Sequence, residues 1–307
     1  MSDLTVLLDG KSLNVRMEST TLRVERPGTR PQRIPLNLIG RVVVTGNPLV
    51  ACGVWRALAE KNVPAVLLPA RGRGEPAWIG AGPSGRVTLR MRQYRAALDE
   101  DRTLEIARRL VRQKIEGQQK WMADRDENAA PAGDREVLER CRRDLATAET
   151  RERLMGLEGA AAAAYFRTVS AALPPRWNFS GRNRRPPRDP VNSLLSLTYV
   201  LAGSEISRIL RDRGLDPFVG FLHGLQDGRE SLMLDVLEPL RPMLDRFVFS
   251  LLDSTVTPED FTRSPRDGCR LRRDGRTRFY GAWADGEGVP ALKTAGEAVA
   301  DAVLDRC

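Results

Sequence analysis

The spacing of apolar residues changes part-way along the chain, and this change limits the folds that the sequence can adopt. Up to about residue 70, short apolar runs alternate with polar or glycine-containing segments, a pattern typical of β-strands. The expected strands are LTVLL from Leu4, SLNVRM, TLRVER ending at Arg26, the run Arg33 to Val44 and the run Val63 to Leu68, with one short helix at Leu49 to Glu60. We therefore expect a small N-terminal domain rich in β-strands.

Beyond residues 70–86, apolar residues recur at helical spacing. The intervening stretch, ARGRGEPAWIGAGPSGR, is dense in Gly and Pro and fits a hairpin or linker, so we place the domain boundary near residue 84. Helices are expected at Leu89 to Trp121, Asp134 to Ala146, Arg151 to Ala172, Pro190 to Asp212 and Ser231 to Leu252. The predicted class is α+β, with a small β-rich domain over residues 1–84 and a larger all-α domain over residues 85–307.

The balance of charge is strongly basic. The 307 residues carry a formal net charge of +9, mostly through arginine, whose planar guanidinium suits phosphate oxygens. Nucleic acid is the leading partner, although charge alone also fits a basic protein with a solvated surface. Four scattered cysteines form no C-x-x-C pair, which argues against a zinc or redox motif. With no signal-peptide pattern and no apolar stretch of about 20 residues, we expect a soluble, intracellular protein.

One glutamate lies in an apolar helical segment. Glu158 is flanked by Leu157, Gly159 and a run of alanines in LMGLEGAAAAAYF. A buried carboxylate needs a cation or a metal as its partner, which makes Glu158 a candidate ligand. The alternative is that Glu158 lies on the polar edge of an amphipathic helix.

The only histidine of the chain lies close to two more acids. His223 ends an apolar segment in GFLHGLQDGRESLMLDVLEPLRP, and Ser231 can cap the helix that follows. Asp235 and Glu238 are three residues apart and therefore share a helix face. With Glu158 they give a mixed N and O donor set suited to Mg²⁺ or Mn²⁺. Alternatively, the acids are solvated surface residues and His223 is a core histidine.

A basic loop precedes the helix that starts at Pro190. In PPRWNFSGRNRRPPRDP, five arginines are interleaved with Trp177 and Phe179: Arg176, Arg182, Arg184, Arg185 and Arg188. Arginines bind phosphates and aromatic rings stack on bases, so the loop is a candidate strand-binding surface. The alternative is a disordered basic loop with Trp177 in the core. Tyr165, two turns from Glu158, is expected to line the same site.

Three segments in this order resemble one known family: LMGLEGAAAAAYF, RDPVNSLLSLTYVL and GFLHGLQDGRESLMLDVLEPLRP. They are similar to the CRISPR-associated endonuclease and integrase of the adaptation module, the first-numbered Cas protein. The resemblance covers essentially the whole chain and includes the C-terminal GCRLRRDGRTRFYGAW. It implies that Glu158, His223 and Glu238 bind the metal and that Asp235 lies beside it. Glu238 stands where some members of the family have Asp.

The resemblance also implies a reaction and a set of partners. A DNA 3′-hydroxyl would attack a phosphodiester at the ends of a CRISPR repeat, with Mg²⁺ or Mn²⁺ as cofactor, and so insert spacer DNA. The protein would act as a homodimer, associating through its β domain, with the small dimeric second-numbered Cas protein, in the prokaryotic cytoplasm. The alternatives are a transposon-borne homologous integrase and a non-catalytic DNA-bridging scaffold.

Overall fold

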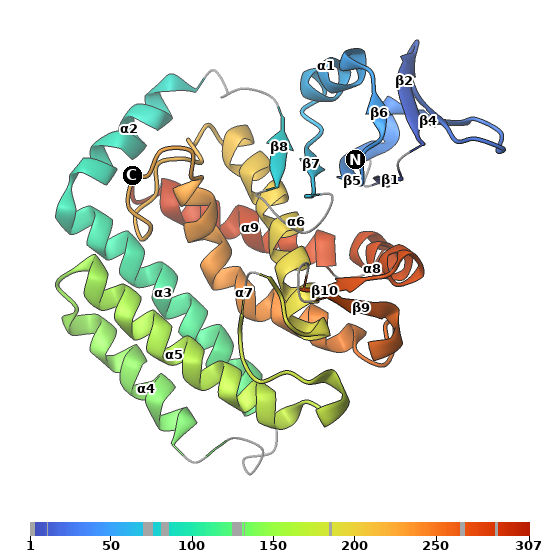
Figure 1. Ribbon diagram of the computed structural model, residues 1–307. Coiled ribbons are helices and arrows are strands. Elements are labelled where there is room, and N and C mark those ends of the chain that lie inside the picture. Colours follow the sequence, from blue (N-terminus) through green and yellow to red (C-terminus); the bar gives the residue numbers. More distant parts are fainter. Residues whose placement is uncertain are drawn as a thin grey trace.

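The computed structural model describes residues 4–10, 12–69, 76–80, 86–124, 131, 133–183, 186–264, 268–285 and 288–307. Strands are the main secondary structure of the first 80 residues and helices fill most of the rest, in agreement with the predicted α+β class (Figure 1). Among the described residues, no helix is both long enough and apolar enough to cross a bilayer.

The N-terminal part contains two four-stranded sheets and one helix (Figure 1). In the first sheet, β1 (Leu4–Asp9), β5 (Ile39–Thr45) and β7 (Ala65–Leu67) are parallel, and β8 (Ala77–Ile79) is antiparallel to β7. In the second, the order is β4 (Gln32–Pro35), β3 (Thr21–Glu25), β2 (Asn14–Glu18) and β6 (Leu49–Val50). Apolar residues that alternate along the strands, such as Leu22 and Val24, are buried with α1 (Cys52–Glu60). The predicted β-rich region is confirmed, whereas its division from the rest at residue 84 stays a prediction.

The remaining helices are α2 (Val87–Leu98), α3 (Glu100–Ala123), α4 (Asp134–Asp144), α5 (Arg151–Ala172), α6 (Pro190–Asp212), α7 (Ser231–Leu251), α8 (Arg273–Asp285) and α9 (Gly288–Leu304). The expectation of an all-α second domain is wrong in one place. β9 (Phe261–Ser264) and β10 (Gly268–Leu271) form an antiparallel pair, in which alternate residues such as Cys269 and Leu271 are buried against the helices. The helix expected over Leu89 to Trp121 is also two helices, because the Asp99 side chain accepts a hydrogen bond from the Arg102 N–H and caps α3.

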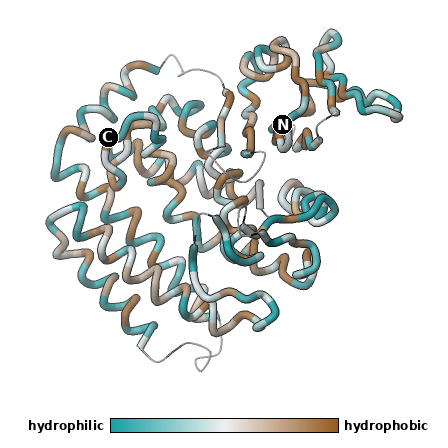
Figure 2. The backbone as a smooth tube through the Cα atoms, in the orientation of Figure 1, coloured by the Kyte–Doolittle hydropathy of each residue, from teal (hydrophilic) through white to brown (hydrophobic). Residues whose placement is uncertain are grey.

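The first sheet lies against α6, so the two parts of the chain are in contact (Figure 1). Arg41 of β5 lies 3.8 Å from Glu205 of α6, and both side chains are buried. Arg276 of α8 donates to Asp9 of β1 at 2.7 Å. Figure 2 shows that apolar (brown) and polar (teal) residues alternate in short stretches along the helices. Helices α3, α4 and α5 lie side by side on the opposite side of α7 (Figure 1).

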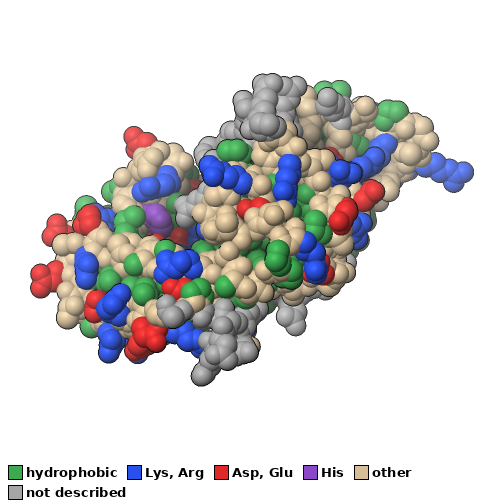
Figure 3. Space-filling model, turned by 60° about the horizontal axis from the view of Figure 1, so that its bottom comes forward, with side chains coloured by type: hydrophobic (Ala, Val, Ile, Leu, Met, Phe, Trp, Pro, Cys, Tyr) green, Lys and Arg blue, Asp and Glu red, His purple; other side chains and the backbone are tan. Residues whose placement is uncertain are grey.

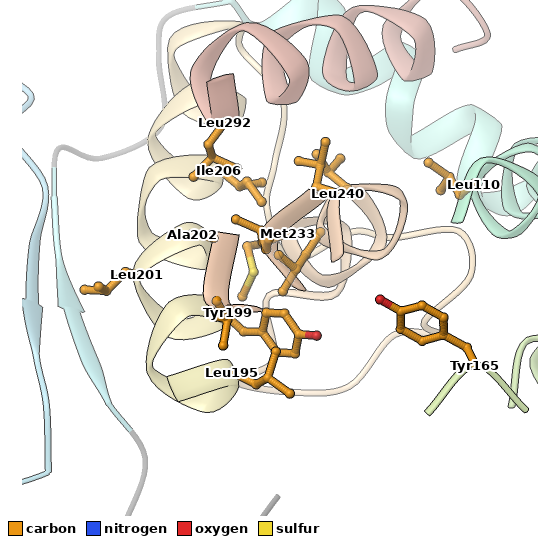
Figure 4. Close-up of a cluster of buried hydrophobic side chains, with 14 of the residues drawn as sticks. Leu110, Tyr165, Leu195, Tyr199, Leu201, Ala202, Ile206, Met233, Leu240 and Leu292 are labelled. Carbon is orange, nitrogen blue, oxygen red and sulfur yellow. The ribbon is translucent and has the colours of Figure 1, made fainter. Parts of the chain in front are cut away.

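The main core lies between α3, α6, α7 and α9. Figure 4 shows Ile206 of α6, Leu240 of α7 and Leu292 of α9 pointing toward one another, and all three are nearly fully buried. Tyr199 lies at one end of this cluster and its hydroxyl points out of α6 (Figure 4). The core therefore fixes α7, the helix that carries Asp235 and Glu238 of the predicted site.

A glycine allows α3 and α7 to approach closely. A Cβ added at Gly117 would lie 2.9 Å from Cγ of Pro242, closer than two carbon atoms normally come. We expect Gly117→Ala to lower the free energy of unfolding by about 1–3 kcal/mol through overpacking, measured by urea denaturation. Gly156→Ala on α5 is the control: it meets open space and should be neutral or stabilise by up to about 1 kcal/mol. Equal changes in unfolding free energy for the two variants would show that the close approach of Gly117 to Pro242 does not matter for stability.

Candidate active site

Two of the predicted ligands share a lysine that the sequence had not singled out. Lys114 of α3 donates from Nζ to Oε2 of Glu238 on α7 at 2.5 Å, and it forms an ion pair with Glu158 of α5. Lys114 and Glu238 are nearly fully buried, whereas Glu158 keeps 24% of its side chain exposed. The three helices therefore bring both carboxylates to one buried ammonium group.

A second cation holds Glu238. Arg241, one turn further along α7, lies with Nε 3.0 Å from Oε2 of Glu238, the same oxygen that Lys114 binds. Burial raises the pKa of the Glu238 carboxyl, but Arg241 and Lys114 outweigh burial and hold that pKa well below its usual value. When protonated, His223 adds to this lowering. Glu238 is therefore ionised at neutral pH.

Asp235 holds the turn that carries the histidine. Its carboxylate is fully buried and accepts the backbone N–H groups of Phe221 at 2.5 Å, Leu222 at 2.9 Å and His223 at 2.9 Å. Its Oδ1 also lies 2.7 Å from Nδ1 of His223. A Cβ added at Gly220 would lie 2.7 Å from Oδ2 of Asp235, so the glycine is required for this approach. Asp235 therefore positions His223, and both of its carboxylate oxygens are occupied by these hydrogen bonds.

This contact decides which ring nitrogen is available. An ionised carboxylate can only accept hydrogen bonds, so Nδ1 of His223 must carry the proton that it shares with Asp235. The lone pair is then on Nε2. A carboxylate that orients a ligating imidazole in this way is typical of histidines that bind metals. The His223 side chain keeps 21% of its surface exposed, and Figure 3 shows the histidine (purple) at the molecular surface.

The three predicted ligands are of the chemical types that suit a divalent cation. Within the part of the chain that the structure describes, no three His, Cys, Asp or Glu side chains are close enough together to hold a metal ion. However, a cation, the ammonium of Lys114, already lies between the carboxylates of Glu158 and Glu238. Carboxylate oxygens with one imidazole nitrogen are ligands suited to Mg²⁺ or Mn²⁺. The residues that could hold the ion are therefore Glu158, His223 and Glu238.

An open cleft of about 420 Å³ adjoins the two carboxylate-binding cations. Glu158 and Lys114 line it, so it opens directly onto the acidic cluster. Two arginines flank the ring of Tyr199: the guanidinium of Arg241 lies 4.3 Å and that of Arg182 lies 5.4 Å from its centroid. The other lining residues are Gln118, Gly159, Ala162, Ala163, Phe166, Arg167, Ser180, Gly181 and Asp245. A cleft with small residues on one side and cations on the other suits a phosphate-bearing strand.

The Tyr199 hydroxyl contacts a buried acid, Asp245. The hydroxyl donates to Oδ1 of Asp245, and both residues are buried. Burial raises the pKa of Asp245 to about 6, although the Tyr199 hydrogen bond and Arg241 oppose that rise. Burial also raises the pKa of Tyr199.

Asp245 should make stability depend on pH. Because its folded pKa is raised, its contribution is present below the unfolded value and is lost as the pH rises toward about 6. Asp245→Asn mimics the protonated acid, so between about pH 4 and pH 7 the variant should gain roughly 3 kcal/mol of unfolding free energy relative to wild type. Urea denaturation of both proteins across that range measures this. A difference that does not change with pH would contradict the assignment.

Only some arginines of the basic loop before α6 lie where a DNA strand in the cleft could contact them. Arg182 lines the cleft, and Arg188 is exposed nearby. Arg176 is exposed but forms an ion pair with Asp253 at 2.5 Å. Arg184 and Arg185 lie outside the described residues.

The aromatic rings that were predicted to contact DNA are buried in this structure. Trp177 is fully buried, in edge contact with Phe261, and Phe179 is also buried. Tyr165 is fully buried and packs edge-on against Trp121 at 5.3 Å, so it faces the core rather than the cleft. For Trp177 and Phe179, burial of the large rings outweighs the polar sequence around them. Base stacking would require them to leave the core.

Four residues of this site were not among the predicted ones: Lys114, Tyr199, Arg241 and Asp245. Lys114 follows Leu110 at helical spacing on the apolar stripe of α3, and a lysine on such a stripe requires a buried anion. Arg241 lies one turn after Glu238, where a cation is expected beside a buried acid. Tyr199 and Asp245 look like ordinary helix residues in the sequence, and their partnership depends on how α6 and α7 pack.

Comparison with known proteins places this geometry in a family. The model of the family "CRISPR associated protein Cas1" matches residues 6–285. The CRISPR-associated endonuclease Cas1 1 of Thermodesulfovibrio yellowstonii is 33% identical over 285 residues, which are 90% of this chain and 89% of that protein.

Two solved structures have the same fold. A casposase bound to integration product has a TM-score of 0.84 at 22% identity, covering 100% of this chain and 92% of the casposase. A Cas6-RT-Cas1–Cas2 complex has a TM-score of 0.83 at 22% identity, covering 99% of this chain and 35% of that chain. Because the family model matches most of the sequence and a curated relative is 33% identical along nearly its whole length, the chain belongs to the CRISPR-associated Cas1 family.

Proposed function

We propose that this protein is a divalent-metal-dependent DNA endonuclease and integrase that inserts spacer DNA into a CRISPR array by transesterification at the repeat ends. The observation that carries the proposal is the pair of carboxylates, Glu158 and Glu238, held around one cation beside the imidazole that Asp235 orients. Family membership supports the same reading, since the curated relative is named an endonuclease.

Each residue of the site has a separate task. Glu158, Glu238 and the Nε2 atom of His223 would hold the ion, which when bound polarises a phosphoryl oxygen and favours ionisation of the attacking 3′-hydroxyl. Asp235 keeps the proton of His223 on Nδ1, so Nε2 stays free to bind. Arg182 and Arg241 offer fixed positive charge to the phosphates of a strand in the cleft.

The reaction needs no covalent bond to the protein. A 3′-hydroxyl oxygen forms a new bond to phosphorus while the bond between phosphorus and the leaving 3′-oxygen breaks, so one phosphodiester replaces another. The leaving oxygen takes up a proton as the attacking hydroxyl loses one. The protein therefore has to position two DNA segments and neutralise charge, which suits a site made of ligands and arginines.

The proposed assembly is a homodimer that binds DNA together with the small dimeric second-numbered Cas protein. The solved structure described as a Cas6-RT-Cas1–Cas2 complex supports such a partner for this fold. The two N-terminal sheets are the proposed region of self-association. Cross-linking of the isolated protein, followed by mixing with the small partner, tests both contacts.

Half-site integration into a repeat-containing plasmid tests the proposed activity. Wild type with Mg²⁺ or Mn²⁺ should join a spacer to the plasmid, more efficiently with the small partner, whereas His223→Ala should join at background level. Chelation of the metal by EDTA should abolish joining by wild type. Undiminished joining by His223→Ala would refute the assignment of His223 as a metal ligand. If the protein showed no cleavage of branched DNA that depends on Glu158, the alternative of a non-catalytic scaffold would be favoured.

A further inference from the structure

The position of Lys114 has a consequence for how the site is loaded. We propose that Lys114 is a built-in cation that competes with the divalent metal for Glu158 and Glu238, and that DNA phosphate in the adjoining cleft draws Lys114 away. DNA binding and metal binding would then strengthen each other. This inference rests on the proposed function, because it takes the two carboxylates as metal ligands.

The first step of the argument is geometric. The Lys114 ammonium binds carboxylate oxygens of both Glu158 and Glu238, so it holds the position where their negative charges converge. A divalent cation that uses both carboxylates must take the place of that ammonium, since two cations so close together repel strongly. The affinity for metal therefore includes the free energy of moving Lys114.

The second step concerns where Lys114 can go. Only 6% of its side chain is exposed, and a buried ammonium is costly unless an anion or water receives it. Lys114 lines the open cleft together with Arg182 and Arg241. A phosphate of a strand in that cleft would supply the anion that the displaced ammonium needs. Without DNA, a displaced Lys114 ammonium would lie close to the positively charged guanidinium groups of Arg182 and Arg241, with no anion beside it.

The third step is thermodynamic. If phosphate stabilises the conformation in which Lys114 has left the carboxylates, DNA must raise metal affinity, and metal must raise DNA affinity by the same factor. Replacing Lys114 with an uncharged side chain removes the cation that competes with the metal. It also removes the coupling between DNA binding and metal binding. The predicted signature is tight metal binding that no longer depends on DNA.

Calorimetric titration with Mn²⁺ tests this in the full-length protein. The proteins are wild type, Lys114→Met, Lys114→Arg and Lys120→Met, each with and without a short single-stranded oligonucleotide whose dideoxy 3′ end prevents joining. Lys120 is the matched control, because it is an exposed lysine on the same helix. Without DNA, Lys114→Met should bind Mn²⁺ about tenfold or more tightly than wild type, while Lys120→Met and Lys114→Arg should not gain affinity. The oligonucleotide should tighten Mn²⁺ binding to wild type and change it little in Lys114→Met.

Thermal unfolding covers the case in which Lys114→Met is unstable. Without metal, this variant should melt below wild type because Glu158 loses its cation and Glu238 keeps only Arg241, and Mn²⁺ should raise its melting temperature more than that of wild type. Unchanged or weaker Mn²⁺ binding by Lys114→Met, or DNA that leaves the wild-type affinity unchanged, would overturn the inference. If the inference failed in this way but a Glu158→Gln protein, titrated in parallel, no longer bound Mn²⁺, the proposed function would stand. If none of the proteins bound Mn²⁺, both the inference about Lys114 and the proposed metal-dependent function would be refuted.

Discussion

The Glu238→Gln protein should join DNA roughly a thousandfold more slowly than wild type, because it loses a charged metal ligand and with it several kcal/mol of stabilisation of the transition state. The same substitution should also weaken the fold. Lys114 and Arg241 both bind Oε2 of Glu238. A neutral amide in that position leaves two buried cations short of negative charge, at a cost of about 3–5 kcal/mol.

Two further variants separate the loss of a ligand from the loss of stability. Glu158→Gln should lose joining to a similar degree but little stability, since this side chain is 24% exposed and water can solvate Lys114 on that side. Glu238→Asp keeps the charge and should retain part of both properties. Half-site integration and urea denaturation on the three proteins measure the two effects. Joining by Glu238→Gln within about tenfold of wild type would rule out Glu238 as a ligand.

The helices that the sequence predicts best are those with strong local signals. Helices α5 and α6 begin and end as expected, because the side chains of Thr150 and Asp189 cap their first turns and Pro190 fits the first helical position. The break at Asp99 was missed, although Asp99 is also a cap. Apolar spacing continues across it, and periodicity alone does not show where one helix ends and the next begins.

The strands β9 and β10 were missed for a different reason. Both are only four residues long, and they pair with each other. Cys269 donates its backbone N–H to the carbonyl of Pro187 at 2.7 Å, so the pair is also fixed by a segment some 80 residues earlier in the chain. Such a contact depends on tertiary structure and leaves no local pattern.

The predicted ligands came from residue types and resemblance, whereas their partners came only from the structure. A lysine within the apolar stripe of α3 was a usable signal, but its two acids lie 44 and 124 residues away. Trp177 shows the opposite problem. Its arginine-rich neighbours suggested the surface, yet its ring is buried, and its Nε1 donates to Asp253 at 3.3 Å.

Asp235→Asn should misplace the histidine while leaving the rest of the site intact. The Asp235 carboxylate accepts three backbone N–H groups and the Nδ1–H of His223, so every contact requires an acceptor. An amide brings an NH₂ group that must face at least one of these donors. We expect a loss of about 1–3 kcal/mol in unfolding free energy and a 10–100-fold loss, to order of magnitude, in Mn²⁺ affinity and joining rate.

The histidine itself reports whether this loss comes from positioning. His223 is the single histidine of the chain, so ¹⁵N NMR of the imidazole gives one unambiguous pair of signals. Wild type should carry its proton on Nδ1, and Asp235→Asn should shift the proton to Nε2, which removes the lone pair that the metal requires. Asp227→Asn, an exposed acid in the same loop, should change neither the tautomer nor the metal affinity. An Asp235→Asn protein that loses stability but keeps the Nδ1–H tautomer would make Asp235 a purely structural residue, and the orientation of His223 would need another cause.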